Sequence, residues 1–184
     1  MLPTQDDSDD GLIYLDHNAS SPLAPEVTAT LERVMALQLG NPSSGHWAGS
    51  AAAAVVQHAR QQIAEALGAA AAQIVFTSGG SESNNHAIKG ILFKALAAGI
   101  KHPHFVCSAV EHPAIVAPLA FAKRLGAHVT TVAVDGHGMV AADDVEAALR
   151  ADTVLVTVMH ANNEVGTLQP IEAIARVCRA RSIP

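Results

Sequence analysis

From residue 73 onward, short apolar runs alternate with helical patterns, and this alternation restricts the chain to few folds. Extended runs occupy residues 73–77, 104–108, 128–134 and 153–159. Stretches with apolar residues at helical spacing separate them. Strands separated by helices form βαβ units whose strands are parallel. The sequence therefore predicts an α/β three-layer sandwich with a mostly parallel sheet.

The remaining elements follow from caps, turns and periodicity. A short strand-like run is expected at residues 13–15, at the start of the ordered part. The run 153–159, "TVLVTVM", is apolar or β-branched throughout, as expected for a strand buried on both faces. No further strand follows the last helix, so we expect the sheet to have an unpaired apolar edge. Helices are expected over residues 26–40, 51–67, 84–99, 113–126, 142–150 and 170–181.

Charge and cysteine content narrow the classes of function. The net charge of −6 disfavours a nucleic-acid partner. No apolar run approaches the roughly 20 residues of a membrane span, and the first residues do not resemble a signal peptide, so a cytoplasmic protein without a membrane partner is expected. Residues 1–12 are interpreted as an acidic flexible leader. Two cysteines, Cys107 and Cys178, provide neither a disulfide framework nor a four-cysteine zinc site.

Three polar segments fall where ligands bind in open parallel sheets, beyond the carboxyl ends of the strands. They are "SGGSES" after residues 73–77, "AVEHPA" after 104–108, and "HANNEVG" after 153–159. Because the carboxyl ends of parallel strands share one edge of the sheet, the three segments together indicate a ligand site.

The first segment reads equally well as a helix cap and as a phosphate site. Gly79 and Gly80 allow backbone N–H groups to approach an anion, Ser81 adds a hydroxyl, and the next helix offers its N-terminus. Ser81 or Ser83 would also cap that helix, and Glu82 suits its first turn. The segment is neither a P-loop nor G-x-G-x-x-G, which disfavours nucleoside triphosphates and dinucleotides.

The other two segments offer a histidine and a pair of amides. His112 lies in a loop after a strand. Three interpretations fit it: an acid/base group, a ring that stacks on a cofactor, or an exposed histidine without a functional role. Asn162 and Asn163 supply amide donors and acceptors, although asparagine also favours turns. A rival metal site would use His102, His104, Cys107, Glu111 and His112. In an extended strand, residues 104 and 107 point to opposite faces, so no metal is predicted.

Taken in order, five segments resemble the class V, fold-type I pyridoxal-phosphate (PLP) enzymes, specifically the NifS/IscS-like cysteine desulfurases. Selenocysteine lyase is a close relative. The resemblance covers nearly everything from Ile13 to the end. The segments are "YLDHNASSPLAPEV", "GNPSS", "IVFTSGGSESNNHAIKG", "SAVEHPAI" and "MHANNEVGTLQPI".

The resemblance implies a role for each candidate residue. Gly80 and Ser81 would bind the PLP phosphate, with serine in a position where threonine is commoner. His112 would stack on the pyridine ring and relay protons as the catalytic residue. Asn163 would lie near the phenolic oxygen of the ring and the substrate, and Glu164 would hold the loop.

The resemblance also implies a reaction and an architecture. The family converts L-cysteine to L-alanine and moves the sulfur to an enzyme cysteine as a persulfide, for iron–sulfur clusters or other sulfur-containing products. Residues 13–184 would be the N-terminal segment and an incomplete large PLP-binding domain of the fold-type I aminotransferase-like kind, without the small domain. The complete enzyme would be a homodimer, with a sulfur-acceptor protein as a possible further partner.

Two residues that the chemistry needs lie beyond the matched segments. In the family, the lysine that holds PLP covalently and the cysteine that accepts sulfur both come later. Lys89, Lys94, Lys101 and Lys123 match no such motif, so we expect the chain alone to be inactive.

Three alternatives remain open. The segment "KHPHFVCSAVEH" resembles the selenocysteine lyase branch, whose substrate is L-selenocysteine. A non-catalytic chain that binds a partner through its apolar sheet edge is a second alternative, and another class V reaction such as transamination is a third.

Overall fold

The computed structural model describes residues 13–184, which form two compact units divided between Val75 and Phe76. The expected leader, residues 1–12, lies outside the described residues. Among the described residues, no helix is long and apolar enough to cross a membrane.

The first unit is helical. Helix α1 (Pro25–Ala36) starts on Pro25, and α2 (Trp47–Leu67) is followed by a 3-10 turn, η1 (Ala71–Gln73). Gly68 ends α2 in the left-handed conformation at φ 61°, as its position after the apolar stripe predicted. Helix α1 ends before Gly40, because Gln38 already has φ 47°.

Two expected strands are absent from the described part of the chain. Residues 13–15 and 73–77 pair with no strand, and the Ile74 N–H bonds back to Ala71 in the turn instead. An isolated extended segment cannot satisfy its backbone groups without a partner strand. The predictions were wrong because an apolar pattern indicates burial and does not guarantee a neighbour.

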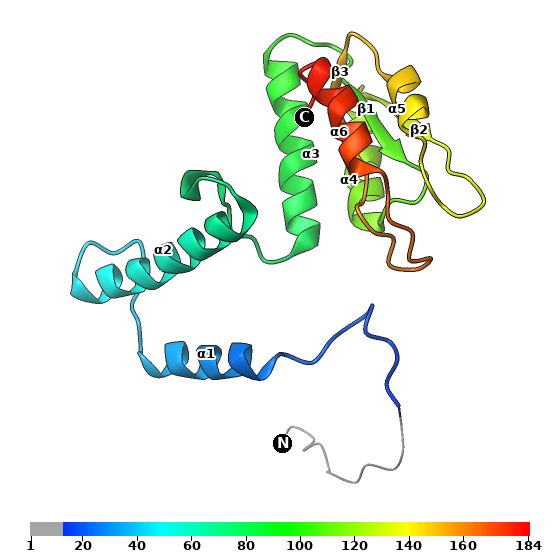
Figure 1. Ribbon diagram of the computed structural model, residues 1–184. Helices are drawn as coiled ribbons and strands as arrows, with labels where there is room; N and C mark the ends of the chain where they lie inside the picture. The colour runs from blue at the N-terminus through cyan, green and yellow to red at the C-terminus, as the bar shows by residue number, and fades with distance from the viewer. Residues whose placement is uncertain (1–12) are drawn as a thin grey trace. The chain divides into compact units, whose positions relative to one another are not determined.

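The second unit contains a three-stranded parallel sheet in the order β2-β1-β3 (Figure 1). Its strands are β1 (His104–Ser108), β2 (His128–Val132) and β3 (Thr153–Thr157). The β1–β3 pairing has a register irregularity between His104 and Phe105. The helices are α3 (Gly80–Ala97), α4 (Pro113–Arg124), α5 (Ala142–Ala148) and α6 (Ile171–Ala180).

Helices cover both faces of this sheet. Phe105 and Cys107 of β1 pack against α3 and α4, in a cluster that includes Ile88 and Leu119. Val106, between them, packs on the other face against residues of α5 and α6. The predicted three-layer α/β arrangement with a parallel sheet is confirmed.

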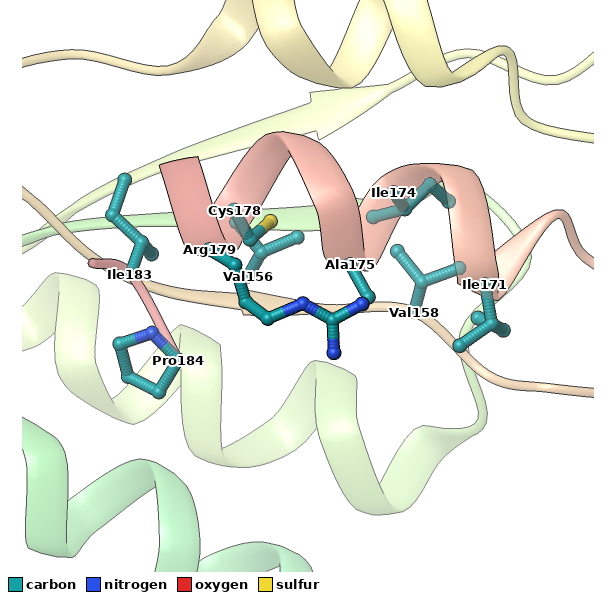
Figure 2. Close-up of a pocket in the computed structure, with 9 residues that line it drawn as sticks. All are labelled: Val156, Val158, Ile171, Ile174, Ala175, Cys178, Arg179, Ile183 and Pro184. Carbon is teal, nitrogen blue, oxygen red and sulfur yellow. The ribbon is translucent and has the colours of Figure 1, made fainter. Parts of the chain in front are cut away.

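Strand β3 departs from its expected burial. It lies at an edge of the sheet and is only half-buried beyond Thr153, whereas β1 is buried throughout. The expected open edge is partly paired, since the Val156 N–H donates to the Pro184 carbonyl at 3.0 Å. An apolar groove of about 270 Å³ lies beside this edge, and Figure 2 shows the side chains that line it. It is lined by Val156, Val158, Ile171, Ile174, Ala175, Cys178, Arg179, Ile183 and Pro184.

A buried histidine links the three strands at the end of the sheet opposite the polar loops. His104 is fully buried; its Nδ1 lies 2.7 Å from the Thr153 hydroxyl and its Nε2 lies 2.8 Å from the Thr130 hydroxyl. Burial lowers the pKa of His104 from its ordinary 6.5, and Arg150 and His128 lower it further, against an opposing effect of Asp152.

This environment predicts a pH-dependent stability. Because the folded pKa lies below 6.5, the unfolded chain takes up the proton first. The contribution of neutral His104 to the free energy of unfolding is therefore complete above pH 6.5. It is lost as the pH falls toward the folded pKa. The urea midpoint of the wild type should fall more steeply between pH 7 and 5 than that of His104→Gln. NMR titration of the His104 ring at or above 6.5 would contradict this.

Candidate functional site

The polar loops gather at one end of the second unit. One follows β1 at residues 109–112, and another follows β3 at residues 158–170. Helix α3 reaches β1 through a short connection at 98–103, so it runs antiparallel to β1 and begins at the end where β1 finishes (Figure 1). Two of the three segments therefore follow strands as predicted, while "SGGSES" lies at the same end of the sheet without a strand before it in the described chain.

No side chain among the described residues caps α3: its N-cap residue is Gly79, and Ser81 and Ser83 lie inside the helix. The Ser78 N–H donates to the Glu82 carboxylate at 2.6 Å, and the hydroxyls of Thr77 and Ser83 lie 2.6 Å apart. Hydrogen bonds from Ser78 hold the pKa of Glu82 below its usual value. The expected cap by Ser81 or Ser83 is therefore not formed.

The two glycines leave open space at this helix end. A Cβ added to Gly79 or Gly80 would meet nothing within 4 Å, and neither residue has a φ that requires glycine. Within the described residues, the chain itself gives no reason for glycine here. The N–H groups of Gly80 and Ser81 belong to the first helical turn, where no intrahelical acceptor exists. This end of α3 fits an anion.

His112 is the N-cap of α4. Its Nδ1 accepts a hydrogen bond from the Ala114 N–H at 3.0 Å. In the neutral ring, Nδ1 therefore carries the lone pair and Nε2 carries the proton. The ring nitrogen available to a ligand is Nε2, as a donor.

The asparagine pair divides into one buried and one exposed residue. Asn162 is 9% exposed, and its Oδ1 accepts from the N–H groups of Glu164 and Val165, each at 2.9 Å. Asn163 is exposed. The expectation that Glu164 holds the loop is corrected, because Asn162 makes these bonds and Glu164 contributes its backbone N–H.

His112 and Asn163 line one cavity of about 330 Å³, as the sequence suggested. Gly80 and Ser81 are not part of its lining. The other lining residues are Ala109, Val110, Glu111, Pro113, Gly138, Asn162, Glu164 and Val165.

Glu111 takes part in the site in a way that sequence reasoning missed. Its carboxylate accepts from the Ser108 hydroxyl at 2.5 Å and from the Met159 N–H at 2.9 Å. The signal was an acidic residue between a strand end and a candidate histidine, which was considered only as a metal ligand.

The rival metal site is not assembled. The His104 ring bonds to Thr130 and Thr153, while Cys107 packs with α3 and α4 on the other face. In the part of the chain that the structure describes, no three His, Cys, Asp or Glu residues come close enough to hold a metal ion.

Comparison with known proteins identifies the family. The Aminotransferase class-V family matches residues 13–183. Cysteine desulfurase IscS of Dictyoglomus turgidum is 43% identical over 171 residues, covering 93% of this chain and 43% of that protein. Cysteine desulfurase IscS of Methanosarcina thermophila is 40% identical, covering 93% and 42%. The chain thus spans less than half the length of these curated relatives.

Solved structures indicate the same family. "SspA in complex with cysteine" superposes with a TM-score of 0.87 at 39% identity, over 93% of this chain and 48% of that one. A "NIFS-LIKE PROTEIN" gives 0.80 at 32% identity, over 89% and 44%. The expected fold, part of the large domain of fold-type I PLP enzymes, is confirmed by these neighbours. The chain belongs to the class-V aminotransferase family, whose members are PLP-dependent, and it is similar to the NifS/IscS-like cysteine desulfurases.

Proposed function

We propose that this chain supplies the PLP-binding half of a cysteine desulfurase. The enzyme would convert L-cysteine to L-alanine and pass the sulfur to an enzyme cysteine. The observation that carries the proposal is the meeting of His112 and Asn163 on one cavity, at the same end of the sheet as the open helix end at Gly80. The similar proteins named cysteine desulfurase, and one solved in complex with cysteine, support it.

The phosphate of PLP would bind at the start of α3. The N–H groups of Gly80 and Ser81 and the Ser81 hydroxyl are donors at the positive end of a helix of 18 residues. The open space at Gly79 and Gly80 is where a bound group would fit.

His112 and Asn163 would hold the ring of PLP. The imidazole would lie against the pyridine ring and donate from Nε2, because Nδ1 is engaged by Ala114. The Asn163 amide would meet the phenolic oxygen. When bound, PLP supplies an electron sink for the carbanion formed at the substrate Cα.

The cysteines of the chain are unsuited to accept sulfur. Cys107 and Cys178 are buried, and burial raises the pKa of both thiols. A sulfur acceptor needs an accessible thiolate. We therefore propose that the acceptor cysteine belongs to a longer enzyme. That enzyme would also supply the lysine for PLP, form a homodimer and work with a sulfur-acceptor protein. L-Selenocysteine remains the alternative substrate.

A non-catalytic binding role is a second candidate, favoured by the apolar groove beside β3. Light scattering tests it, since a monodisperse monomer would count against a groove that requires a partner.

Binding of a phosphorylated ligand tests the site at α3. Pyridoxine 5′-phosphate should bind at least about tenfold more tightly than pyridoxine, because donors at a helix N-terminus favour the phosphate. Gly80→Val should remove this preference by filling the open space. Gly90→Val is the matched control, because its added side chain also meets open space on the same helix. Equal affinity for the two ligands in the wild type would contradict the assignment.

Variants of His112 separate its capping role from its ligand role. His112→Ala should lower the free energy of unfolding by about 1 kcal/mol through loss of the α4 cap, whereas His112→Asn should retain the cap. Both should bind pyridoxine 5′-phosphate more weakly, because the ring is lost. Urea unfolding and ligand titration measure the two effects. Wild-type affinity in His112→Asn would rule out stacking.

The chain alone should not catalyse the reaction. With stoichiometric PLP and L-cysteine, we expect no sulfide release and no borohydride-trapped PLP on any single lysine, because none of the four matches the family motif. Sulfide assays and mass spectrometry check this. Stoichiometric trapping on one of them, such as Lys89, would overturn it.

A further inference from the structure

Side chains to which the proposed function gives no role join the loop of His112 to the loop of Asn163. We propose that Glu111 and Asn162 are positioning residues that lock these loops together and so fix His112 relative to Asn163 before a ligand arrives. The inference deepens the proposed function and rests on it for the identity of the ligand. The lock itself is a property of the unliganded chain.

The backbone pairing between the strands stops short of the site. The β1–β3 register ends at Cys107 and Thr157, so the loops beyond are outside that ladder. Side chains join the two loops there. Each locking residue is also the immediate neighbour of a candidate ligand-binding residue, Glu111 of His112 and Asn162 of Asn163.

Glu111 bridges the ends of the two strands through one oxygen. Its Oε1 accepts from the Ser108 hydroxyl at 2.5 Å and from the Met159 N–H at 2.9 Å. Ser108 is the last residue of β1 and is 2% exposed, while Met159 follows β3. A buried hydroxyl needs such an acceptor, because leaving it unpaired is costly.

Asn162 makes the second connection and has no capacity left for a ligand. Its Nδ2 donates to the Val110 carbonyl in the other loop at 3.1 Å and to Met159 Sδ at 3.2 Å. Its Oδ1 accepts from the N–H groups of Glu164 and Val165. An amide has two donor hydrogens and two acceptor lone pairs, and all four are used. Asn162 therefore holds the loop, and Asn163 is the member of the pair presented on the outside.

Both hydrogen bonds end on Oε1 of Glu111, so a variant can keep the bonds while it removes the negative charge. Glu111→Gln keeps an acceptor oxygen at that position and should preserve both bonds, whereas Glu111→Ala removes them. Hydrogen exchange of the 184-residue chain, followed by NMR without ligand, reports on the lock. Glu111→Ala should speed exchange at the Val165 N–H, and Asn162→Ala at the Met159 N–H, each about tenfold or more. Neither amide is bonded to the side chain removed, so faster exchange reports coupling between the loops.

The controls are Glu111→Gln and Glu172→Ala. Glu111→Gln should exchange as the wild type does at both amides. Glu172 is an exposed acid on α6 whose removal should change neither. Unchanged exchange at the core amide of Val106 confirms that each variant is folded. Slow exchange at Val165 in Glu111→Ala, or fast exchange in Glu111→Gln, would overturn the lock.

Titration with pyridoxine 5′-phosphate tests the consequence. Glu111→Ala and Asn162→Ala should bind at least about fivefold more weakly, since the site must be ordered on binding, and Glu111→Gln should restore wild-type affinity. Unchanged affinity in a variant whose lock is broken would overturn the positioning role. If the wild type itself does not bind, the proposed function fails, and the exchange measurements still decide the lock.

Discussion

The second unit depends on the burial of β1 between two helical layers. Phe105 and Val106 are both fully buried and point to opposite faces, so one short strand anchors α3 and α4 on one side and α5 and α6 on the other. Burial of each large apolar side chain contributes about 1.5–3 kcal/mol. At Ser108 the buried strand ends in a polar group, which bonds to Glu111. The candidate site thus begins where the core ends.

Apolar patterns located the elements whose partners lie within the chain. Strand β1 has the expected limits because its apolar run is closed by Pro103 on one side and the polar loop on the other. The same reasoning failed at residues 73–77. There Val75 and Phe76 are exposed, at 62% and 44%, because no neighbouring strand covers them. For β3, a uniformly apolar run predicted two covered faces, while its position at the edge leaves it half-buried.

The sequence grouped the candidate residues more reliably than it assigned their roles. It placed His112 and Asn163 at one edge of the sheet, and they line one cavity. Its local pattern did not distinguish Asn162 from Asn163, and the family resemblance alone selected Asn163; the three-dimensional hydrogen bonds show that the Asn162 amide is saturated. For the same reason Glu111 was not recognised, since its partners Ser108 and Met159 are brought together only by strand pairing. The sequence could not decide between a cap and an anion site at Gly80; the structure starts the helix after Gly79, so Ser81 and Ser83 do not cap it.

His104 has a consequence for how the strands align. Its ring joins Thr130 on β2 and Thr153 on β3, across a point where the β1–β3 register is irregular. If β3 slipped by one residue so that Val154 took the place of Thr153, the Thr153 hydroxyl would turn to the opposite face and away from His104 Nδ1. A ring nitrogen would then be buried without a partner, at a cost of about 1–3 kcal/mol. The imidazole thus favours the native register of β3 against β1.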